Sequence, residues 1–380
     1  MSDTVTRPAR PILFAMTHST AGGLREIWSD IAEGLAARGF AVGRFVFYPP
    51  TDAKAEGVDR AAWYHLVEQR PASPIAALRL FVALVRHLRH SRPAAVITAM
   101  PATNVLVPLA VTLARVPTRV FISHHSPTGT HNRLLDRLDG WTGGLACVEA
   151  AISVSDAVAA TLEHKPARYL RKRRTIHNAL PERIELLLDA MPRRGELYGR
   201  ARRIVALGRL THQKNYPMLV HAMALVPDAQ LDIVGGGEDE AALRSLVADL
   251  GLEERVRFAG LLGREEALAR VASADIFVQV SHYEGHSLAL VEAARLALPL
   301  IVSDVAVQIE AITARDGTRC GIVVPLGDVA GLARHIEALL SDPRERAAWS
   351  GLSRKIADEA SHTLMIDRYE KILAATFARG

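Results

Sequence analysis

The 380-residue sequence contains few cysteine and aromatic residues, and each shortage excludes certain classes of protein. Its cysteines, Cys147 and Cys320, lie far apart and have no cysteine or histidine nearby at metal-ligand spacing. This argues against a disulfide scaffold or a zinc site and is typical of a reducing compartment. Aromatic residues make up 5% of the chain, and the basic clusters lack interleaved aromatic side chains that could stack on bases. We therefore expect a cytoplasmic protein without a nucleic-acid partner.

Long apolar runs are also scarce. The run from Ile12 to Met16 is too short for the core of a secretory signal peptide. Residues 94–114 carry no charge and approach the roughly 20 residues needed to cross a bilayer. That stretch contains Pro101 and Pro108, however, so we interpret it as a buried strand, a turn and a buried helix.

Hydrophobic residues (49%) and charged residues (23%) are present in the proportions of an ordinary globular protein. The length favours two domains. Residues 1–200 carry a formal net charge of +9 and the remainder −4. The basic clusters at 86–90 and 168–174 have two interpretations, which the sequence leaves open. They are solvated helix faces, or they attract an anionic membrane or a lipid-linked phosphate.

Segments with the patterns of strands and helices alternate along the chain, which predicts parallel sheets covered on both faces. In the first half, strands are expected at 11–16, 41–47, 95–99, 119–123, 151–154 and 175–178. In the second half, they are expected at 203–207, 230–234, 256–258, 276–280, 300–303 and 321–324. The clearest helices are expected at 24–38, 217–225, 240–250, 265–272, 288–296, 329–341 and 365–377. The predicted domains are 1–185 and 202–362, with a linker at 186–201 and a final segment at 363–380.

Polar residues gather at four strand-to-loop junctions, where ligands of such sheets bind. At the first junction, Gly22 and Gly23 enter a helix, so that backbone N–H groups can approach an anion. An ordinary turn between a strand and a helix is the alternative. At the second junction, His124 and His125 end a buried strand. A metal pair there would lack a third ligand nearby.

The third junction joins a glycine to two cations. Gly208 follows a strand, and Arg209 and Lys214 lie five residues apart. Two cations that converge beyond a strand end suit a diphosphate, although a basic surface loop has the same composition. Gly235 and Gly236 follow the next strand, but the dinucleotide fingerprint is broken there, so we assign them a weaker role beside a phosphate or base.

The fourth junction carries two glutamates. Glu284 ends a strand, Gly285 permits a tight turn, and Glu292 lies within an otherwise apolar helix. A charge in such a helix is costly unless it is paired or bound to a ligand. One carboxylate could hold sugar hydroxyls and the other a ribose; a capping glutamate and a surface glutamate are the alternative. The residues that open this helix, with N–H groups suited to an anion, are His286, Ser287 and Leu288.

Together these motifs resemble those of a known enzyme family. The chain is similar to retaining glycosyltransferases of the GT-B class, family four (glycosyl transferases group 1). Gly208-Arg209-Leu210 with Lys214-Asn215 resembles the family's diphosphate loop, and Glu284-Gly285 with Glu292 resembles its paired-glutamate motif. The loop at 17–23 resembles the family's N-terminal glycine loop. The resemblance implies two Rossmann-like domains, an interdomain cleft, and a C-terminal helix that crosses back to the first domain.

The resemblance also implies roles for these residues. Arg209 and Lys214 would hold the donor diphosphate, Glu284 the sugar hydroxyls and Glu292 the ribose. His124 matches a strand-end histidine that lies near the donor sugar. No metal or cofactor is expected; a nucleoside-diphosphate sugar is the donor substrate.

A glycan or lipid-linked molecule is the expected acceptor, and contact with an anionic membrane is possible. The choice between uridine and guanosine stays open. The sequence departs from the family's pattern at two points. Residues 305–308 replace a glycine pair, and Ala297 stands where the family often has glycine. Two alternatives remain, a nucleotide-sugar epimerase of the same architecture and a non-catalytic nucleotide-sugar-binding protein.

Overall fold

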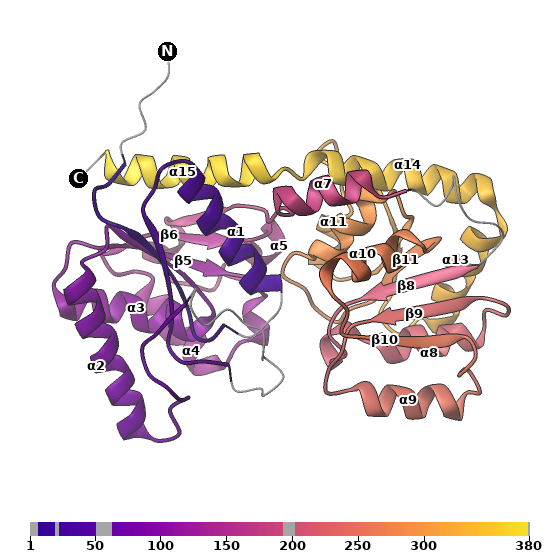
Figure 1. Cartoon of the computed structure of the whole chain (residues 1–380), viewed down its shortest axis with the longest axis horizontal. Coiled ribbons are helices and arrows are strands. Elements are labelled where there is room, and N and C mark those ends of the chain that lie inside the picture. The colour runs from indigo at the N-terminus through magenta and orange to yellow at the C-terminus, as the bar shows by residue number, and fades with distance from the viewer. Residues whose placement is uncertain (1–6, 20–22, 51–62, 193–201, 379–380) are drawn as a thin grey trace, which may run out of the picture. The chain divides into compact units, whose positions relative to one another are not determined.

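A computed structural model describes residues 7–19, 23–50, 63–192 and 202–378 of the chain. The chain divides into two compact units (Figure 1). The first unit comprises residues 1–178 and 363–380, and the second comprises residues 179–362.

The first unit is built on a parallel sheet in which seven strands lie within the described residues. The sheet order is β3-β2-β1-β4-β5-β6-β7, so the first long strand lies inside the sheet. The strands are β1 (Ile12–Met16), β2 (Val42–Val46), β3 (Tyr64–His65), β4 (Ala95–Ala99), β5 (Arg119–His124), β6 (Val148–Ser153) and β7 (Arg173–Thr175). The helices are α1 (Gly23–Ala37), α2 (Pro74–Ser91), α3 (Pro101–Ala114), α4 (Arg133–Thr142), α5 (Asp156–Ala160), α6 (Ala167–Leu170) and α15 (His362–Phe377), whose first residue belongs to the second unit.

The strands at the centre of this sheet are buried on both faces. Every residue of β1 and β4 is buried, which the sequence shows as continuous apolar runs without alternation. Helices α2, α3 and α4 lie on one side of the sheet, and α1 and α15 on the other (Figure 1). On the α1 side, Trp28 meets Phe14 edge to face, with ring centroids 5.7 Å apart.

The C-terminal helix α15 packs on α1. A Cβ on Gly34 would lie 2.7 Å from Ile366 Cδ1, so a larger residue there would force the Ile366 side chain to move. Arg38 adds ion pairs to Asp367 and Glu370, both at 2.5 Å. The structure thus confirms that the C-terminal helix returns to the first unit.

The second unit repeats the same plan with six strands in its sheet among the described residues. The order is β10-β9-β8-β11-β12-β13. The strands are β8 (Arg203–Leu207), β9 (Gln230–Val234), β10 (Val256–Gly260), β11 (Ile276–Gln279), β12 (Leu300–Ser303) and β13 (Ile322–Val324). The helices are α7 (Glu182–Ala190), α8 (Tyr216–Ala224), α9 (Glu240–Asp249), α10 (Arg264–Ala272), α11 (Leu288–Arg295), α12 (Ala306–Ala311), α13 (Val329–Ser341) and α14 (Pro343–Glu359).

The predicted α/β class with two parallel sheets is confirmed, and the predictions at 95–99, 203–207, 230–234 and 300–303 match the strands residue for residue. The strand predicted at 175–178 is wrong, because β7 occupies Arg173–Thr175. This edge strand is only partly buried and consists of basic residues and threonine, so it gives no apolar pattern. Residues 94–114 form β4 and α3, as interpreted. Among the described residues, no helix has the length and apolar character to span a membrane.

The division between the units differs from the predicted boundary at residue 185. Helix α7 begins at Glu182 and belongs to the second unit, where Arg295 pairs with its Asp189 at 2.7 Å. Ile184 and Leu188, four residues apart, are buried and anchor the helix. Because this segment is rich in charged residues, its two buried apolar positions did not indicate a helix in the sequence. Most of the predicted linker, residues 193–201, lies outside the described residues.

Candidate functional site

The candidate site of the second unit lies where its strand order reverses. Strands β8 and β11 are neighbours although two strands separate them in the chain. The loops that follow these two strands diverge at such a point, which makes it the usual ligand site of an open parallel sheet. Arg209 and Lys214 follow β8, and Glu284 follows β11. The topology therefore explains why residues about 70 positions apart in the chain belong to one site.

Direct contacts join the two loops. Gln213 Nε2 donates to the carbonyl of Tyr283 at 3.1 Å and to Glu284 Oε2 at 3.3 Å. The backbone N–H of His282 donates to the carbonyl of Gln213 at 2.8 Å, and Asn215 Nδ2 donates to the carbonyl of Val280 at 3.1 Å. These bonds fix the loops against each other and leave little freedom to the charged side chains between them.

Lys214 and Glu284 form the central ion pair of this site. Lys214 Nζ lies 2.7 Å from Glu284 Oε1, and the two side chains are only 14% and 8% exposed. The same carboxylate oxygen accepts a hydrogen bond from Ser281 Oγ at 2.7 Å. Arg209 is exposed on the preceding loop, and within the described residues it makes no side-chain ion pair. One cation is thus held inside the site and a second lies at its surface.

Glycines allow the loops after β8 and β9 to touch. A Cβ on Gly235 would lie 2.0 Å from the carbonyl oxygen of Gly208, and one on Gly237 would lie 2.2 Å from that of Leu210. Gly208 has φ +153°, and a Cβ on it would lie 2.7 Å from Cε of Lys214. Gly235 and Gly208 are therefore needed for packing, whether or not they also contact a ligand. Gly236 has looser surroundings, with Leu261 Cγ 3.1 Å from where its Cβ would be.

Glu292 lies on α11 and is 1% exposed. It forms an ion pair with Arg264 at the start of α10, which compensates the charge that looked costly in the apolar helix sequence. Ahead of it, Glu284, Gly285, Ser287 and Leu288 are buried and His286 is half-buried. The paired glutamates are thus both buried and both paired with a cation.

Two glutamines reinforce the β11–α11 loop from beneath. Gln308 on α12 donates to the Gln279 carbonyl at 2.9 Å and to Ser303 Oγ at 2.6 Å. Gln279 Nε2 donates to Gln308 Oε1 at 3.0 Å, and its Oε1 accepts from Ser287 Oγ at 2.8 Å. Gln308 belongs to the segment 305–308 that departs from the family's glycine pair. Here α12 begins at Ala306, and Gln308 is buried in a polar network with Gln279 and Ser303.

The glycine loop of the first unit is only partly described. Gly22 lies outside the described residues, whereas Gly23 opens α1. A Cβ on Gly23 would meet nothing within 4 Å, so packing alone does not require glycine there. The loop follows β1, beside β4, where the order of the first sheet reverses.

His124 ends β5 and is buried in a polar cluster of the first unit. Its Nε2 lies 2.6 Å from the Tyr169 hydroxyl and 3.7 Å from Asp139 Oδ1. Lys165 Nζ compensates Asp139 at 3.0 Å and Asp136 at 2.7 Å. Burial lowers the pKa of His124, and the nearby Asp139 partly offsets this effect. These contacts account for a buried histidine without a ligand; its predicted role beside a donor sugar stays a prediction.

His125 is held on the other side of the same strand end. Its Nε2 lies 2.9 Å from Ser123 Oγ, and its ring meets Trp28 edge to face at 4.9 Å. Burial, followed by the neighbouring His124, lowers the pKa of His125 to about 3. Both histidines are therefore neutral at ordinary pH.

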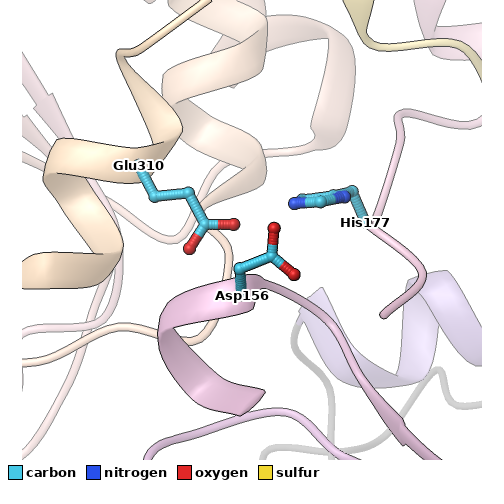
Figure 2. Close-up of side chains that lie close together, drawn as sticks. All are labelled: Asp156, His177 and Glu310. Atoms are coloured by element: carbon cyan, nitrogen blue, oxygen red, sulfur yellow. The ribbon is translucent and has the colours of Figure 1, made fainter. Parts of the chain in front are cut away.

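Three further potential metal ligands, Asp156, His177 and Glu310, are drawn in Figure 2. Asp156 lies in the first turn of α5 and His177 follows β7, both in the first unit. Glu310 belongs to α12 of the second unit. The group therefore does not define a site within either unit.

Sequence reasoning missed three residues of the second-unit site, namely Gln213, Ser281 and Arg264. Gln213 and Ser281 lie beside predicted residues, but uncharged side chains in a loop give no signal of their own. Arg264 did have a signal in the sequence. A cation in the first turn of a helix is unfavourable to the helix dipole, so its presence indicates a carboxylate partner elsewhere.

Comparisons with known proteins show which family and which folds the chain resembles. Residues 189–355 match the family model described as glycosyl transferases group 1. The lipopolysaccharide core biosynthesis glycosyltransferase LpsE of Rhizobium meliloti is 30% identical over 174 residues, 45% of this chain and 49% of that protein. A GDP-mannose-dependent phosphatidylinositol monomannoside mannosyltransferase of Mycolicibacterium smegmatis is 34% identical over 173 residues, 42% of this chain and 44% of that protein. The chain thus spans about half the length of these curated relatives.

Solved structures resemble the chain over nearly its whole length. HepE of Anabaena, in complex with UDP and glucose, has a TM-score of 0.79 at 17% identity and covers 96% of this chain and 100% of its own. Sucrose-phosphate synthase of Thermosynechococcus elongatus has a TM-score of 0.78 at 21% identity, with 98% and 100% covered. At these identities the likeness establishes the fold, which is GT-B. Residues 189–355 are therefore similar to the glycosyl transferases group 1 family, within a chain of the GT-B fold.

Proposed function

We propose that the protein is a retaining, metal-independent glycosyltransferase of the cytoplasm. It transfers a sugar from a nucleoside-diphosphate sugar to a glycan or lipid-linked acceptor. The observation that carries the proposal is the buried Lys214–Glu284 pair at the strand-order reversal of a glycosyl transferases group 1 domain. The relatives named above, one of which works on lipopolysaccharide core and one on a phosphatidylinositol mannoside, support the class of acceptor.

The proposed reaction breaks the bond between the anomeric carbon and the β-phosphate oxygen of the donor. The acceptor hydroxyl oxygen forms the new bond to that carbon, on the same face, and its proton passes to the departing diphosphate oxygen. The nucleoside diphosphate leaves with the electrons of the broken bond. Negative charge therefore develops on the departing phosphate, and a fixed cation beside it lowers the barrier because it needs no reorganisation.

The residues divide this work by their chemistry. Lys214 and Arg209 would neutralise the diphosphate, Lys214 as a point charge and Arg209 by paired hydrogen bonds. Glu284 would accept hydrogen bonds from sugar hydroxyls, because its carboxylate is already oriented by Ser281 and Lys214. Glu292, held by Arg264, would bind the ribose. The backbone N–H groups of residues 286–288, which open α11, would face the phosphates.

A ligand screen tests the proposal directly. The melting temperature of the purified chain is measured with UDP, GDP, ADP and the corresponding sugars, each with and without EDTA. A ligand that binds only the folded protein raises this temperature by mass action. We expect one nucleoside diphosphate to do so with EDTA present, and its sugar to be consumed when an acceptor extract is added.

A shift that EDTA abolishes would contradict metal independence. No shift with any nucleotide would contradict the donor site. A sugar that changes without releasing nucleoside diphosphate would instead indicate an epimerase.

A further inference from the structure

Exposed apolar side chains gather on one side of the first unit. In its described part, all the large ones that are exposed belong to β3, α2, α3 or α4. They are Tyr64, Ile75, Leu78, Val82, Leu113, Leu134 and Trp141. Helix α3 packs between α2 and α4, on the side of the sheet opposite α1 and α15 (Figure 1). The four comparable residues of the second unit are dispersed instead: Leu186 lies on α7, and the others follow α8, β10 and β13, namely Leu225, Leu261 and Leu326.

Helix α2 presents the densest part of this surface. Ile75, Leu78 and Val82 are 67%, 61% and 39% exposed, although a leucine or isoleucine is normally buried in a helix that covers a sheet. The inner side of the same helix is occupied by Leu80, Leu84 and Leu88, which are buried. The outer apolar residues are therefore additional to those needed for packing.

Arginines share the outer face of α2 with these apolar residues. Positions 75, 79, 82, 86 and 89 are spaced four, three, four and three residues apart, which places them along one side of a helix. Arg79, Arg86 and Arg89 are exposed. The helix contains no acidic residue, and residues 1–200 carry a net charge of +9.

We propose that this outer face of α2, formed by Ile75, Leu78, Arg79, Val82 and Arg86, binds the surface of an anionic phospholipid membrane. Apolar side chains of an interfacial helix enter the boundary between headgroups and acyl chains, while arginines meet the phosphates at the same depth. Arginine is also common at protein–protein interfaces, so the choice of a membrane rests on charge: residues 1–200 carry +9, and the helix has no acidic residue. The interleaving of Arg79 and Arg86 with three apolar residues, without one acid, therefore matches lipid headgroups.

The proposal deepens the proposed function, since a lipid-linked acceptor would be reached at such a surface. It concerns binding alone, however, and its test needs no turnover. The full chain is floated with vesicles of pure phosphatidylcholine, and with vesicles of phosphatidylcholine and phosphatidylglycerol in equal amounts. We expect binding to the anionic vesicles only, weakening as salt is raised above about 0.1 M, where the Debye length is about 10 Å.

Two double variants test the face. Arg79→Glu/Arg86→Glu is expected to weaken binding by at least about 25-fold, since each arginine near the surface contributes about fivefold. Ile75→Ser/Leu78→Ser is expected to weaken binding severalfold while keeping its salt dependence. Matched controls lie in the second unit. Arg257→Glu/Arg344→Glu and Leu186→Ser/Leu225→Ser alter exposed residues of the same types and are expected to bind like the parent.

Each other outcome has a defined meaning. Equal binding to neutral vesicles, or an equal loss in the control pairs, overturns the proposal. Self-association in sedimentation velocity that Ile75→Ser/Leu78→Ser abolishes, without vesicle binding by the parent, makes the face a contact between copies and also overturns it. The nucleotide-induced melting shift, measured on every variant, keeps this result separate from the donor site.

Discussion

In both units the first long strand lies inside the sheet, and the strand order reverses beside it. The buried ion pairs of the two units, however, lie at different places relative to this reversal. In the second unit, the Lys214–Glu284 pair lies at the reversal between β8 and β11. In the first unit, the reversal lies between β1 and β4, whereas the buried ion pairs of Lys165 lie against α4, beyond β5.

This difference separates charges that serve a ligand from charges that serve the fold. A buried ion pair at a strand-order reversal can exchange a protein partner for a ligand, because the loops there diverge. Lys165, which is 2% exposed, has two carboxylate partners and a carbonyl within its own cluster, so no ligand is needed to compensate it. The same topology thus supports a proposed donor site in one unit and a structural cluster in the other.

The largest effect is expected from breaking the first-unit cluster. Lys165→Met leaves Asp139, whose side chain is 4% exposed, without its cation. Removing one partner of a buried pair costs about 3–5 kcal/mol, and we expect the free energy of unfolding to fall by that amount in a denaturant titration.

The matched control is Lys165→Met/Asp139→Asn, which should recover much of the loss because the most deeply buried carboxylate is removed, while Asp136 keeps its contact with His164 at 2.8 Å. Nucleotide binding by the second unit should be unchanged in both variants at temperatures where they are folded. An unchanged stability in Lys165→Met would contradict the structural role assigned to this cluster.

The second effect concerns the proposed donor site. Lys214→Ala removes the internal cation that would stabilise the leaving diphosphate, and we expect kcat to fall by about 10²–10³, as for the loss of one preorganised group. The measurement is the initial rate of nucleoside diphosphate release. Because the variant leaves Glu284 buried without its cation, stability must be followed in parallel.

The control for this prediction is Lys214→Ala/Glu284→Gln. It should regain stability, and its kcat should stay well below that of Glu284→Gln alone if Lys214 acts on the substrate. Recovery of both would mean that Lys214 serves only to compensate Glu284.

The sequence alone predicted which residues lie at the same edge of the sheet, but not which of their side chains are in contact. Arg209, Lys214, Glu284 and Glu292 follow strands whose apolar runs are unambiguous, so their shared edge of one sheet was predictable. That Lys214 pairs with Glu284 depends on which strands are neighbours, and a crossover of two strands leaves no local trace in the sequence.

The fully buried position of His124 was equally hidden. Tyr169, its hydrogen-bond partner, lies 45 residues away on α6, a helix of four residues that has no recognisable periodicity. In such cases, residue types predict the chemistry of a site, and only the packing decides which side chains meet.

A third, intermediate effect is the pH dependence of stability that His125 of the first unit contributes. The folded pKa of His125 is about 3, against 6.5 for an unperturbed histidine. As the pH falls below 6.5, the unfolded chain takes up a proton that folded His125 does not, so its contribution to stability is lost between pH 6.5 and about 3. Below pH 6.5, this loss of folding free energy approaches about 1.4 kcal/mol per pH unit.

His125→Gln should remove this component, so the melting temperature of the parent should fall faster than that of the variant between pH 6.5 and 4. The difference between the two curves isolates His125 from the other titrating groups. Parallel curves would contradict the burial of His125 against Trp28.

The smallest effect is expected at Ala297, where the chain departs from the glycine that is frequent in the family. Ala297 lies two residues after α11, next to its C-cap, with φ +57°, in the left-handed region that suits glycine at a helix C-terminus. Relief of this strain, about 1–2 kcal/mol, exceeds the entropy cost of a glycine in the unfolded chain. We therefore expect Ala297→Gly to raise the free energy of unfolding by about 0.5–1 kcal/mol in a denaturant titration.

The control is Ala242→Gly on the exposed side of α9, where the backbone is right-handed and the same change should destabilise by about 1 kcal/mol. If both variants lose stability, the strain at Ala297 is already relieved by its surroundings, including the Ser350 hydroxyl that donates to its carbonyl. If Ala297→Gly gains stability while the nucleotide-induced melting shift also changes, this departure bears on the donor loop at Glu284 as well as on the end of α11.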